Sequence, residues 1–435
     1  MTDTSERHLE PATRLTGTVR VPGSKSLSNR ALLLAALSEG ETRLTGLLDS
    51  DDVRHMLKAL QALGVSWAHE SDGVVRVEGT GGRFPRAAGD LFLGNAGTAV
   101  RTLVAALALH GAEDGNEITV RGIERMHERP IGDLVEAVNA LGASVRYLGN
   151  SGYPPLAIGA LGGELRREVS VRGNVSSQFT TGLLQAAPLL PGGLTLQVEG
   201  ELISRPYVDM TIALMARFGV EVETLDAGFA VAPGQRYRSP GDCAVEGDAS
   251  SASYFLAAGL LGGGPVTVEG VGSSSLQGDV AFADHLADFG AEVVVEPERI
   301  HVSRRGTIPA FDRDFNDIPD AAMTFAVVAL FADGPCTLRN IGSWRVKETD
   351  RIHAMATELQ KFGARVEQGD DWLRVWPCPS PTARVAVDTY DDHRIAMCFS
   401  LVACAGVPVT IRDPGCVAKT FPRYFEAFDA LRVTT

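Results

Sequence analysis

The first half of the chain contains no cysteine. All six cysteines lie at or after Cys243, and none of them belongs to a Cys-x-x-Cys pair. We therefore expect buried thiols and neither a disulfide framework nor a zinc site. Long apolar runs are missing too, and the stretch from Met1 to Pro11 is polar and charged rather than signal-like. These absences predict a cytoplasmic protein with no membrane span.

An excess of positive charge is also missing. The 54 acidic residues outnumber the 40 Lys and Arg residues, which gives a net charge of -14 and argues against a general nucleic-acid surface. A local cluster of cations could still bind a small anion. With 435 residues, the chain exceeds one ordinary hydrophobic core, so we expect two or three domains.

One pattern recurs about every 70–78 residues. It is an amphipathic helix that ends at a glycine and is followed by a strand, and glycine is the expected residue just past a helix end. A weaker sixth copy starts at Tyr424. The five strong copies end at Gly64, Gly142, Gly219, Gly290 and Gly363.

Each copy also carries a second helix, which is apolar on nearly every face and therefore predicted to be buried. Small polar residues precede it, and a glycine-containing turn with a short strand follows it. The repeating unit is thus strand, helix, strand, helix, strand, and the fold class is α/β.

Six such units suggest two domains of three units each. We place one boundary in the turn-rich stretch 238–241 and expect the residues before Gly23 to pair with the second half. The predicted domains are residues 23–241, and residues 1–22 together with 242–435. Two chain crossings would form a hinge, and a cleft between hinged lobes is a natural small-molecule site.

The stretch VPGSKSLSNRALLLAAL, from Val21 to Leu37, is the first buried helix. Lys25 and Arg30 lie in its first turns, where the helix dipole favours negative rather than positive charge. Basic residues beside exposed N–H groups form an anion site. The alternative is a core helix with solvated basic residues at its start.

Basic residues recur at comparable helix starts and loops of the other units. Together they predict a cleft for phosphates and carboxylates, although each one alone could be a solvated surface charge. The residues are Lys25, Arg30, Arg129, Lys347, Arg351, Arg394 and Lys419.

Three further residues are candidates for proton transfer. Asp320 follows Pro319 at a helix start, where it could instead be a helix cap, and Glu348 lies in WRVKETDR, where it could instead form a local ion pair. A carboxyl group among cations has a lowered pKa and can act as a base. His393 in YDDHR is the third, unless it only pairs with Asp391 or Asp392.

The sequence resembles the 5-enolpyruvylshikimate-3-phosphate (EPSP) synthase family of bacterial type. The motifs that carry this resemblance follow one another in the family's order over nearly the whole chain. They are VPGSKSLSNRALLLAAL, LFLGNAGTAVR, RMHERPIGDL, GNVSSQF, SRPYVD, VEGDASSASYF, IPDAAMT, WRVKETDR, YDDHR and AKTFPRY.

The resemblance implies an inside-out α/β barrel in each of two lobes, with three βαβαββ units per lobe. It implies transfer of the enolpyruvyl group of phosphoenolpyruvate to the 5-hydroxyl of shikimate 3-phosphate, by addition and then elimination of phosphate. This is the sixth step of the shikimate pathway to chorismate. It implies a monomer without a metal or organic cofactor, and inhibition by glyphosate.

The resemblance also assigns residues to shikimate 3-phosphate, mainly in the first lobe. Lys25 would touch both substrates and Gln178 would lie near both. Ser26 and Arg30 would hold the carboxylate, and Tyr207 would pack on the ring. The phosphate would be held by Ser176, Ser177 and Ser204.

For phosphoenolpyruvate and the chemistry, the resemblance implies a second set. Asp320 would bind the shikimate hydroxyls and move protons beside Lys347, with Glu348 as the second acid or base. Asn95 and Ser343 would also contact substrate, although Ser343 stands where the family often carries Asn and has fewer hydrogen-bonding groups. Phosphoenolpyruvate would be held by Gly97, Arg129, Arg351, Arg394 and Lys419.

Two other functions remain open. The related transferase that acts on UDP-N-acetylglucosamine typically carries a reactive cysteine in a loop of the first half, where this chain has Arg129 and no cysteine. A non-catalytic phospho-ligand binding protein would keep the arginines but would not need both Asp320 and Glu348.

Overall fold

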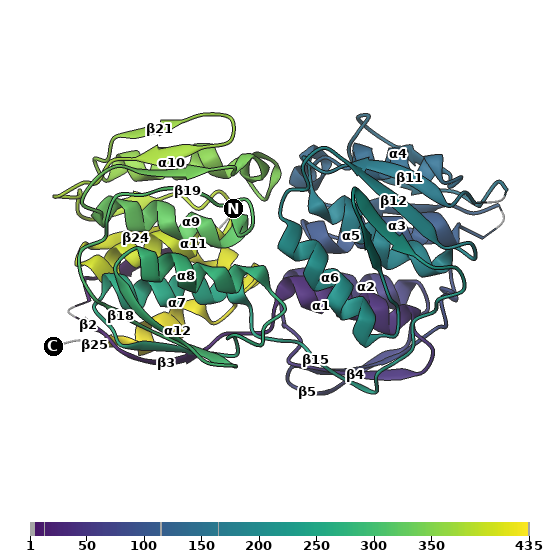
Figure 1. Cartoon of the computed structure of the whole chain (residues 1–435), viewed down its shortest axis with the longest axis horizontal. Helices are drawn as coiled ribbons and strands as arrows, with labels where there is room; N and C mark the ends of the chain where they lie inside the picture. Colours follow the sequence, from purple (N-terminus) through teal and green to yellow (C-terminus); the bar gives the residue numbers. More distant parts are fainter. Residues whose placement is uncertain (1–4, 13, 114, 164, 434–435) are drawn as a thin grey trace. The chain divides into compact units, whose positions relative to one another are not determined.

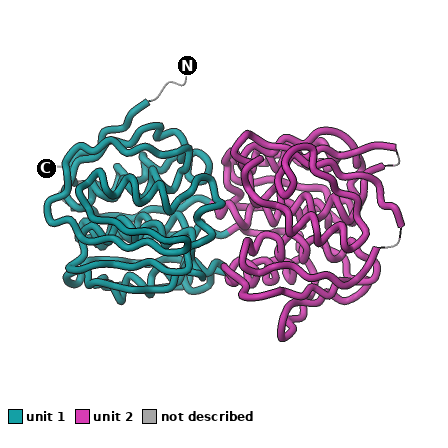
Figure 2. Tube along the Cα trace, turned by 90° about the horizontal axis from the view of Figure 1, so that it is seen from above, with its two compact units in different colours: residues 1–22, 246–435 teal, residues 23–245 magenta. Residues whose placement is uncertain are grey.

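The computed structural model describes residues 5–12, 14–113, 115–163 and 165–433. These residues form two compact units, coloured in Figure 2. Unit 2 holds residues 23–245, and unit 1 holds the residues up to Pro22 together with those from Glu246 onward. Within the described ranges, no helix combines the length and the apolar character that a membrane crossing requires.

Unit 2 consists of three βαβαββ repeats. The first contains β15 (Asp242–Ala244), α1 (Lys25–Leu37), β4 (Glu41–Thr45), α2 (Asp51–Ala62), β5 (Trp67–Ser71) and β6 (Val74–Glu78). The second contains β7 (Gly89–Phe92), α3 (Gly97–His110), β8 (Ile118–Arg121), α4 (Gly132–Ala140), β9 (Val145–Tyr147) and β10 (Leu156–Ile158). The third contains β11 (Glu168–Arg172), α5 (Ser177–Ala186), β12 (Leu194–Glu199), α6 (Arg205–Arg217), β13 (Glu223–Leu225) and β14 (Gly228–Val231).

Unit 1 repeats the plan. Its first repeat contains β3 (Gly17–Arg20), α7 (Ala249–Leu261), β16 (Val266–Glu269), α8 (Phe282–Asp288), β17 (Ala291–Val295) and β18 (Arg299–Arg304). The next contains β19 (Asp312–Asp314), α9 (Pro319–Val328), β20 (Cys336–Arg339), α10 (Arg351–Lys361), β21 (Val366–Gln368) and β22 (Leu373–Val375). The last contains β23 (Val385–Val387), α11 (His393–Ser400), β24 (Val409–Arg412) and α12 (Tyr424–Ala430), with β1 (Glu6–Leu9) at the sheet edge. Strands β2 (Arg14–Leu15) and β25 (Arg432–Val433) form a separate pair.

Each repeat forms its own sheet, in which the two strands that flank the buried helix run parallel. Strands β7 and β8 around α3 are an example, and the hairpin β9–β10 then adds antiparallel strands. The first sheet of each unit takes its first strand from a distant part of the chain. Strand β15 pairs with β4, and β3 pairs with β16. Because β15 belongs to the sheet of β4, unit 2 continues to Val245, beyond the boundary predicted at residues 238–241.

The hydrophobic core of each unit is built around three buried helices. Helix α3 packs against α1 and α5 in unit 2, and α9 packs against α7 and α11 in unit 1 (Figure 1). All residues of α7 are buried, as are Gly97 to Leu109 of α3. This explains why these helices are apolar on every face, since burial of each large apolar side chain contributes roughly 1.5–3 kcal/mol. The predicted α/β fold of two units with three repeats each is confirmed, and among the described residues the last repeat of unit 1 departs from the βαβαββ plan because its sheet has three strands.

The amphipathic helices end as the sequence pattern predicts. Helix α4 stops at Ala140, and Gly142 has a φ of 108°, a left-handed value that only glycine adopts without strain. The corresponding glycines of the other four strong copies also have positive φ values. The chain therefore turns sharply after each of these helices and enters the next strand.

Candidate active site

The N-terminal end of α1 carries the first predicted residues. The Ser24 hydroxyl caps the helix by accepting from the Leu27 N–H at 3.4 Å. The cap starts the helix at Lys25, whose Nζ lies 3.7 Å from the Asp52 carboxylate. Ser26 is half-buried in the same turn. The polar residues before this apolar run thus define a helix end, and they keep a cation there with a carboxylate beside it.

Arg30 is almost completely buried, although its hydrogen-bond acceptors are neutral. Its Nε donates to the Thr211 hydroxyl at 2.8 Å, and its other nitrogens donate to the Ser26 carbonyl and the Thr181 hydroxyl. Burial lowers the pKa of the Arg30 guanidinium to about 10. A buried cation held by neutral groups favours binding of an anion such as a carboxylate.

Helices α5 and α6 both supply hydroxyls that bind Arg30, and their N-terminal ends carry the next predicted residues. The Ser176 hydroxyl caps α5 by accepting from the Gln178 N–H, and the Gln178 side chain donates to the Thr98 hydroxyl on α3 at 3.4 Å. Ser177 is the buried first residue of α5. Ser204 precedes α6 with a left-handed φ of 53°, and Tyr207 follows in the first turn of α6. Three predicted phosphate-binding serines therefore lie at two helix N-termini, where N–H groups favour anions.

Arg129 is a second buried cation, and its hydrogen bonds go to neutral oxygens. Its NH1 donates to the backbone carbonyl of Asn95 at 3.0 Å and to the Asn95 side-chain oxygen at 2.9 Å. Its Nε is buried and has no hydrogen-bond partner among the described residues. Gly97 lies against this guanidinium, because a Cβ there would be 2.5 Å from Arg129 NH2. The structure thus gives Asn95 a role, because its oxygens hold the Arg129 guanidinium.

In unit 1, Asp320 lies at the start of α9 among three cations. One carboxylate oxygen is 3.0 Å from Arg351 NH1 and 3.5 Å from Lys347 Nζ, and the other is 3.0 Å from Arg394 NH2. Burial raises the pKa of the Asp320 carboxyl, but Arg394, Lys347 and Arg351 together outweigh burial and hold that pKa well below its usual value. Asp320 is therefore ionised at neutral pH.

Arg351, the first residue of α10, connects three carboxylates. It contacts Glu348 at 2.8 Å and Asp392 at 2.8 Å, in addition to Asp320. Burial lowers the pKa of the Arg351 guanidinium, but the three carboxylates raise it by more, so that the net shift is upward. The other Glu348 oxygen lies 3.9 Å from Lys419 Nζ. Glu348 therefore lies between Arg351 and Lys419, two of the residues that are predicted to bind phosphoenolpyruvate.

The start of α11 places Asp392, His393 and Arg394 beside the cluster of Asp320 and Arg351. Asp392 caps the helix by accepting from the Arg394 N–H at 2.9 Å, and Arg394 NH1 donates to the Tyr254 hydroxyl at 3.1 Å. His393 is fully buried, with Nδ1 3.5 Å from the Asp392 carboxylate. This contact is the pairing that the sequence left as the alternative for His393, and its catalytic role stays a prediction.

The predicted residues of unit 2 lie at or beside the starts of α1, α3, α5 and α6, and we call them the unit 2 group; those of unit 1 that contact one another are the unit 1 group. In unit 1, the contacts join Asp320, Lys347, Glu348, Arg351, Arg394 and Lys419, whereas Ser343 is half-buried in the short 3-10 helix Gly342–Val346. Sequence reasoning missed Tyr254, and it considered Asp392 only as a partner of His393. The pair Asp391–Asp392 in front of two basic residues was a signal for Asp392, since an Asp at a helix start commonly caps it.

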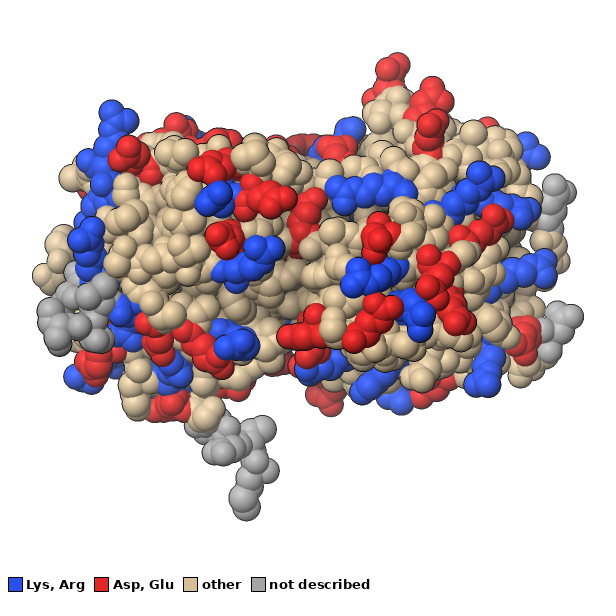
Figure 3. Space-filling view, turned by 90° about the horizontal axis from the view of Figure 1, so that it is seen from below, with Lys and Arg blue, Asp and Glu red and all other residues tan. Residues whose placement is uncertain are grey.

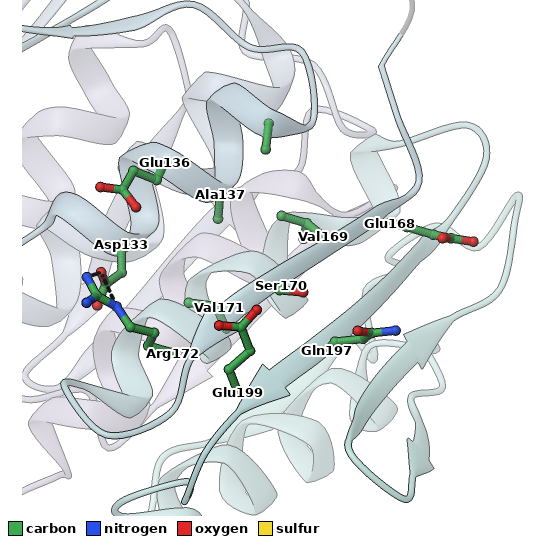
Figure 4. Close-up of a pocket in the computed structure, with 11 residues that line it drawn as sticks. Asp133, Glu136, Ala137, Glu168, Val169, Ser170, Val171, Arg172, Gln197 and Glu199 are labelled. Atoms are coloured by element: carbon green, nitrogen blue, oxygen red, sulfur yellow. Dashed lines mark hydrogen bonds and ion pairs between the residues drawn. The ribbon is translucent and has the colours of Figure 1, made fainter.

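Two cavities lie elsewhere, and no predicted site residue lines them. One, of 520 Å³, lies in unit 2 between α4 and β11 and is lined by acidic side chains and by Arg172, which pairs with Asp133 (Figure 4). The other, of 830 Å³, lies in unit 1 beside the ends of α7 and α9. Among the described residues, no group of three or more His, Cys, Asp or Glu side chains could hold a metal ion. On the face shown in Figure 3, acidic and basic side chains are interspersed.

Comparison with known proteins agrees with the resemblance. Residues 9–428 match the model of the family EPSP synthase (3-phosphoshikimate 1-carboxyvinyltransferase). A 3-phosphoshikimate 1-carboxyvinyltransferase from Paraburkholderia phymatum is 58% identical over 97% of this chain and 98% of its own length. The enzyme of that name from Ralstonia nicotianae is also 58% identical, over 98% of this chain and 99% of its own length.

Solved structures show the same fold. EPSP synthase from Acinetobacter baumannii superposes with a TM-score of 0.79 at 25% identity, covering 99% of this chain and 98% of the other. The enolpyruvyl transferase NikO from Streptomyces tendae has a TM-score of 0.77 at 18% identity, covering 98% and 96%. The latter likeness concerns the fold alone.

Proposed function

The chain belongs to the EPSP synthase (3-phosphoshikimate 1-carboxyvinyltransferase) family, and on that premise we propose which of its residues carry out the reaction. The enzyme transfers the enolpyruvyl group of phosphoenolpyruvate to the 5-hydroxyl of shikimate 3-phosphate and releases phosphate, a step of the shikimate pathway. The ionised Asp320, held among Lys347, Arg351 and Arg394, is the observation that most supports the assignment below.

The group in unit 2 holds shikimate 3-phosphate. Arg30 binds the carboxylate together with Ser26, because it is a buried cation whose hydrogen-bond acceptors are neutral. The hydroxyls of Ser176, Ser177 and Ser204 hold the phosphate at the starts of α5 and α6. Tyr207 packs on the ring, and Lys25 and Gln178 lie where both substrates can be reached.

Phosphoenolpyruvate is bound by groups of both units. Arg129 from unit 2 has a buried Nε available to an anion, and Gly97 beside it leaves no side chain in the way. Arg351, Arg394 and Lys419 come from unit 1. The proposal therefore requires residues of both units to act on the same pair of substrates. Asn95 acts through Arg129, and Ser343 is a minor substrate contact.

Proton transfer follows from the charges of the unit 1 group. Protonation of the phosphoenolpyruvate methylene makes a cation-like carbon, which the 5-hydroxyl attacks while a base takes the hydroxyl proton. Asp320 is the base, since its cationic neighbours keep it ionised. Glu348 and Lys25 act at the methylene carbon. They deliver the proton for addition and remove a proton from the resulting methyl group for elimination. His393 lies next to Asp392 and is the remaining candidate for a role in proton transfer.

Phosphate release from phosphoenolpyruvate tests the assignment directly. Release should require shikimate 3-phosphate, and UDP-N-acetylglucosamine should not replace it. Turnover with UDP-N-acetylglucosamine alone would instead indicate the related transferase. Binding of both ligands without turnover would indicate a phospho-ligand binding protein.

The remaining expectations belong to the same proposal. We expect a monomer in the cytoplasm that uses no metal or organic cofactor and binds neither nucleic acid nor a membrane. Glyphosate should compete with phosphoenolpyruvate, because a phosphonate carries the same kind of charge as the phosphate that Arg129 and Arg394 are proposed to bind. Gel filtration and inhibition kinetics test these two points.

A further inference from the structure

Two consecutive residues in the loop before α11 have a left-handed backbone conformation, and neither is glycine. The φ of Tyr390 is 55° and that of Asp391 is 52°. Left-handed residues with a Cβ are sterically disfavoured, and such strain persists only where surrounding contacts hold it. The next residue is Asp392, which caps α11 and contacts Arg351. The strained turn therefore leads directly into the unit 1 group.

A buried carboxylate on α10 holds this turn. The Tyr390 hydroxyl donates to Glu358 Oε1 at 2.7 Å, although the residue itself is 38% exposed. Glu358 is fully buried, and its Oε2 accepts from the Asp388 N–H at 3.1 Å and pairs with Lys361 at 2.7 Å. Glu358 therefore binds the loop on both sides of Thr389.

Helix α10 thus contacts the turn at two places along its length. Arg351 at its N-terminal end bonds Asp392, and Glu358 two helical turns later bonds Tyr390. Residues at that spacing lie on one face of a helix. One helix face consequently fixes both ends of the stretch from Tyr390 to Asp392.

We propose that Tyr390 is a positioning residue for enolpyruvyl transfer. Its hydroxyl, through Glu358, holds the strained turn in the conformation in which Asp392 keeps Arg351 and Arg394 in place for phosphoenolpyruvate. This inference rests on the assignment of both arginines to phosphoenolpyruvate under the proposed function. Tyr390 acts through Asp392 and is not itself a catalytic residue.

The test removes the hydroxyl and keeps the ring. Tyr390→Phe should lower kcat/KM for phosphoenolpyruvate by about tenfold, while the Kd of shikimate 3-phosphate stays unchanged. Tyr237→Phe is the matched control, because it also removes one tyrosine hydroxyl, which donates to the Gln185 carbonyl at 2.9 Å in unit 2. The control should keep the parental kcat/KM. Equal kcat/KM values for both variants would overturn the inference.

A comparison of Tyr390→Phe with the double variant Tyr390→Phe/Asp391→Gly separates a positioning effect from a general loss of protein stability. In Tyr390→Phe/Asp391→Gly, glycine accepts the left-handed conformation without strain, so part of the lost kcat/KM should return. Hydrogen exchange in residues 389–394 should be faster in Tyr390→Phe and slower again in the double variant. Absence of both effects would show that the bond does not hold a strained turn.

Arg394→Lys distinguishes failure of this inference from failure of the proposed function. If Arg394→Lys leaves the KM for phosphoenolpyruvate unchanged, the assignment of Arg394 is wrong. If it raises that KM and Tyr390→Phe does not lower kcat/KM, only the inference about Tyr390 is wrong.

Discussion

Asp320 and Arg351 share a hydrogen bond of 3.0 Å although they lie in the first turns of different helices, α9 and α10. Arg351 is almost inaccessible to solvent, and its other contacts are also carboxylates. Arg351 therefore helps Arg394 and Lys347 to keep the proposed base ionised, and the buried pair contributes to the stability of unit 1.

Asp320→Asn should destabilise the protein by about 3 kcal/mol at pH 7, because it removes one partner of a buried ion pair. The pKa of Asp320 is lowered in the folded state, so its stabilisation is complete above the unfolded-state pKa of about 3.9 and is lost as the pH falls through the folded value. The difference between parent and variant should therefore shrink below about pH 4. Urea unfolding across this range measures it, with the exposed Asp226→Asn as the control. A difference that does not depend on pH would contradict the low pKa.

Lys25→Ala should lower kcat by at least about 10²-fold while the fold survives, since general acid–base groups contribute that much and Lys25 is only half-buried at a helix end. Steady-state kinetics and a circular-dichroism melt measure both effects. Lys58→Ala on the exposed side of α2 is the matched control and should change neither. A kcat near that of the parent would exclude the catalytic role.

Gly97→Ala should raise the KM for phosphoenolpyruvate and should also weaken inhibition by glyphosate. A methyl group in the pocket would by itself exclude glyphosate, the longer ligand, more than phosphoenolpyruvate. In the structure, that methyl group would lie 2.5 Å from Arg129 NH2 and 3.1 Å from Arg101 NH1, so Arg129 must move. Inhibition kinetics at fixed phosphoenolpyruvate compare both ligands. Gly162→Ala, whose Cβ would meet nothing within 4 Å, is the control. An unchanged KM would show that Arg129 moves without loss of binding.

Thiol alkylation at pH 8 should leave most of the activity intact. Burial raises the pKa of Cys336 to about 11 and of Cys398 to about 12, so their reactive thiolate fractions are very small. Burial also raises the pKa of Cys416, which lies three residues before Lys419 in the sequence. Iodoacetamide followed by an activity assay tests this, with Cys416→Ser as the control. Rapid inactivation of Cys416→Ser that phosphoenolpyruvate prevents would point to a reactive cysteine in the site.

The repeat architecture could be predicted because its signals are local. An apolar helix, an amphipathic helix and a glycine with positive φ such as Gly142 depend on packing within about 70–78 residues. The exact limit of unit 2 could not be predicted in this way. It depends on β15, three residues long, whose place is set by pairing with β4 about 200 residues earlier. A strand this short has no periodicity of its own.

The candidate site was predictable as a set of charged residues and not as a set of contacts. The sequence places Arg351 after Glu348 and Asp350, but its two other carboxylate partners, Asp320 and Asp392, come from other helices. The same limit applies to Gly97. The resemblance assigns Gly97 to phosphoenolpyruvate, but only the structure shows the Arg129 guanidinium beside it. Side-chain contacts between distant segments leave no trace in local composition.

Strands β1 and β3 have a consequence for synthesis of the chain. They precede unit 2 in the chain, whereas their partners β24 and β16 lie after residue 245. During translation, neither strand can therefore pair until unit 2 has been synthesised. Unit 2 is one continuous segment and can fold in the meantime. A fragment of residues 23–245 contains every strand of its sheets, whereas a fragment that begins at Glu246 leaves two sheets with an unfilled edge.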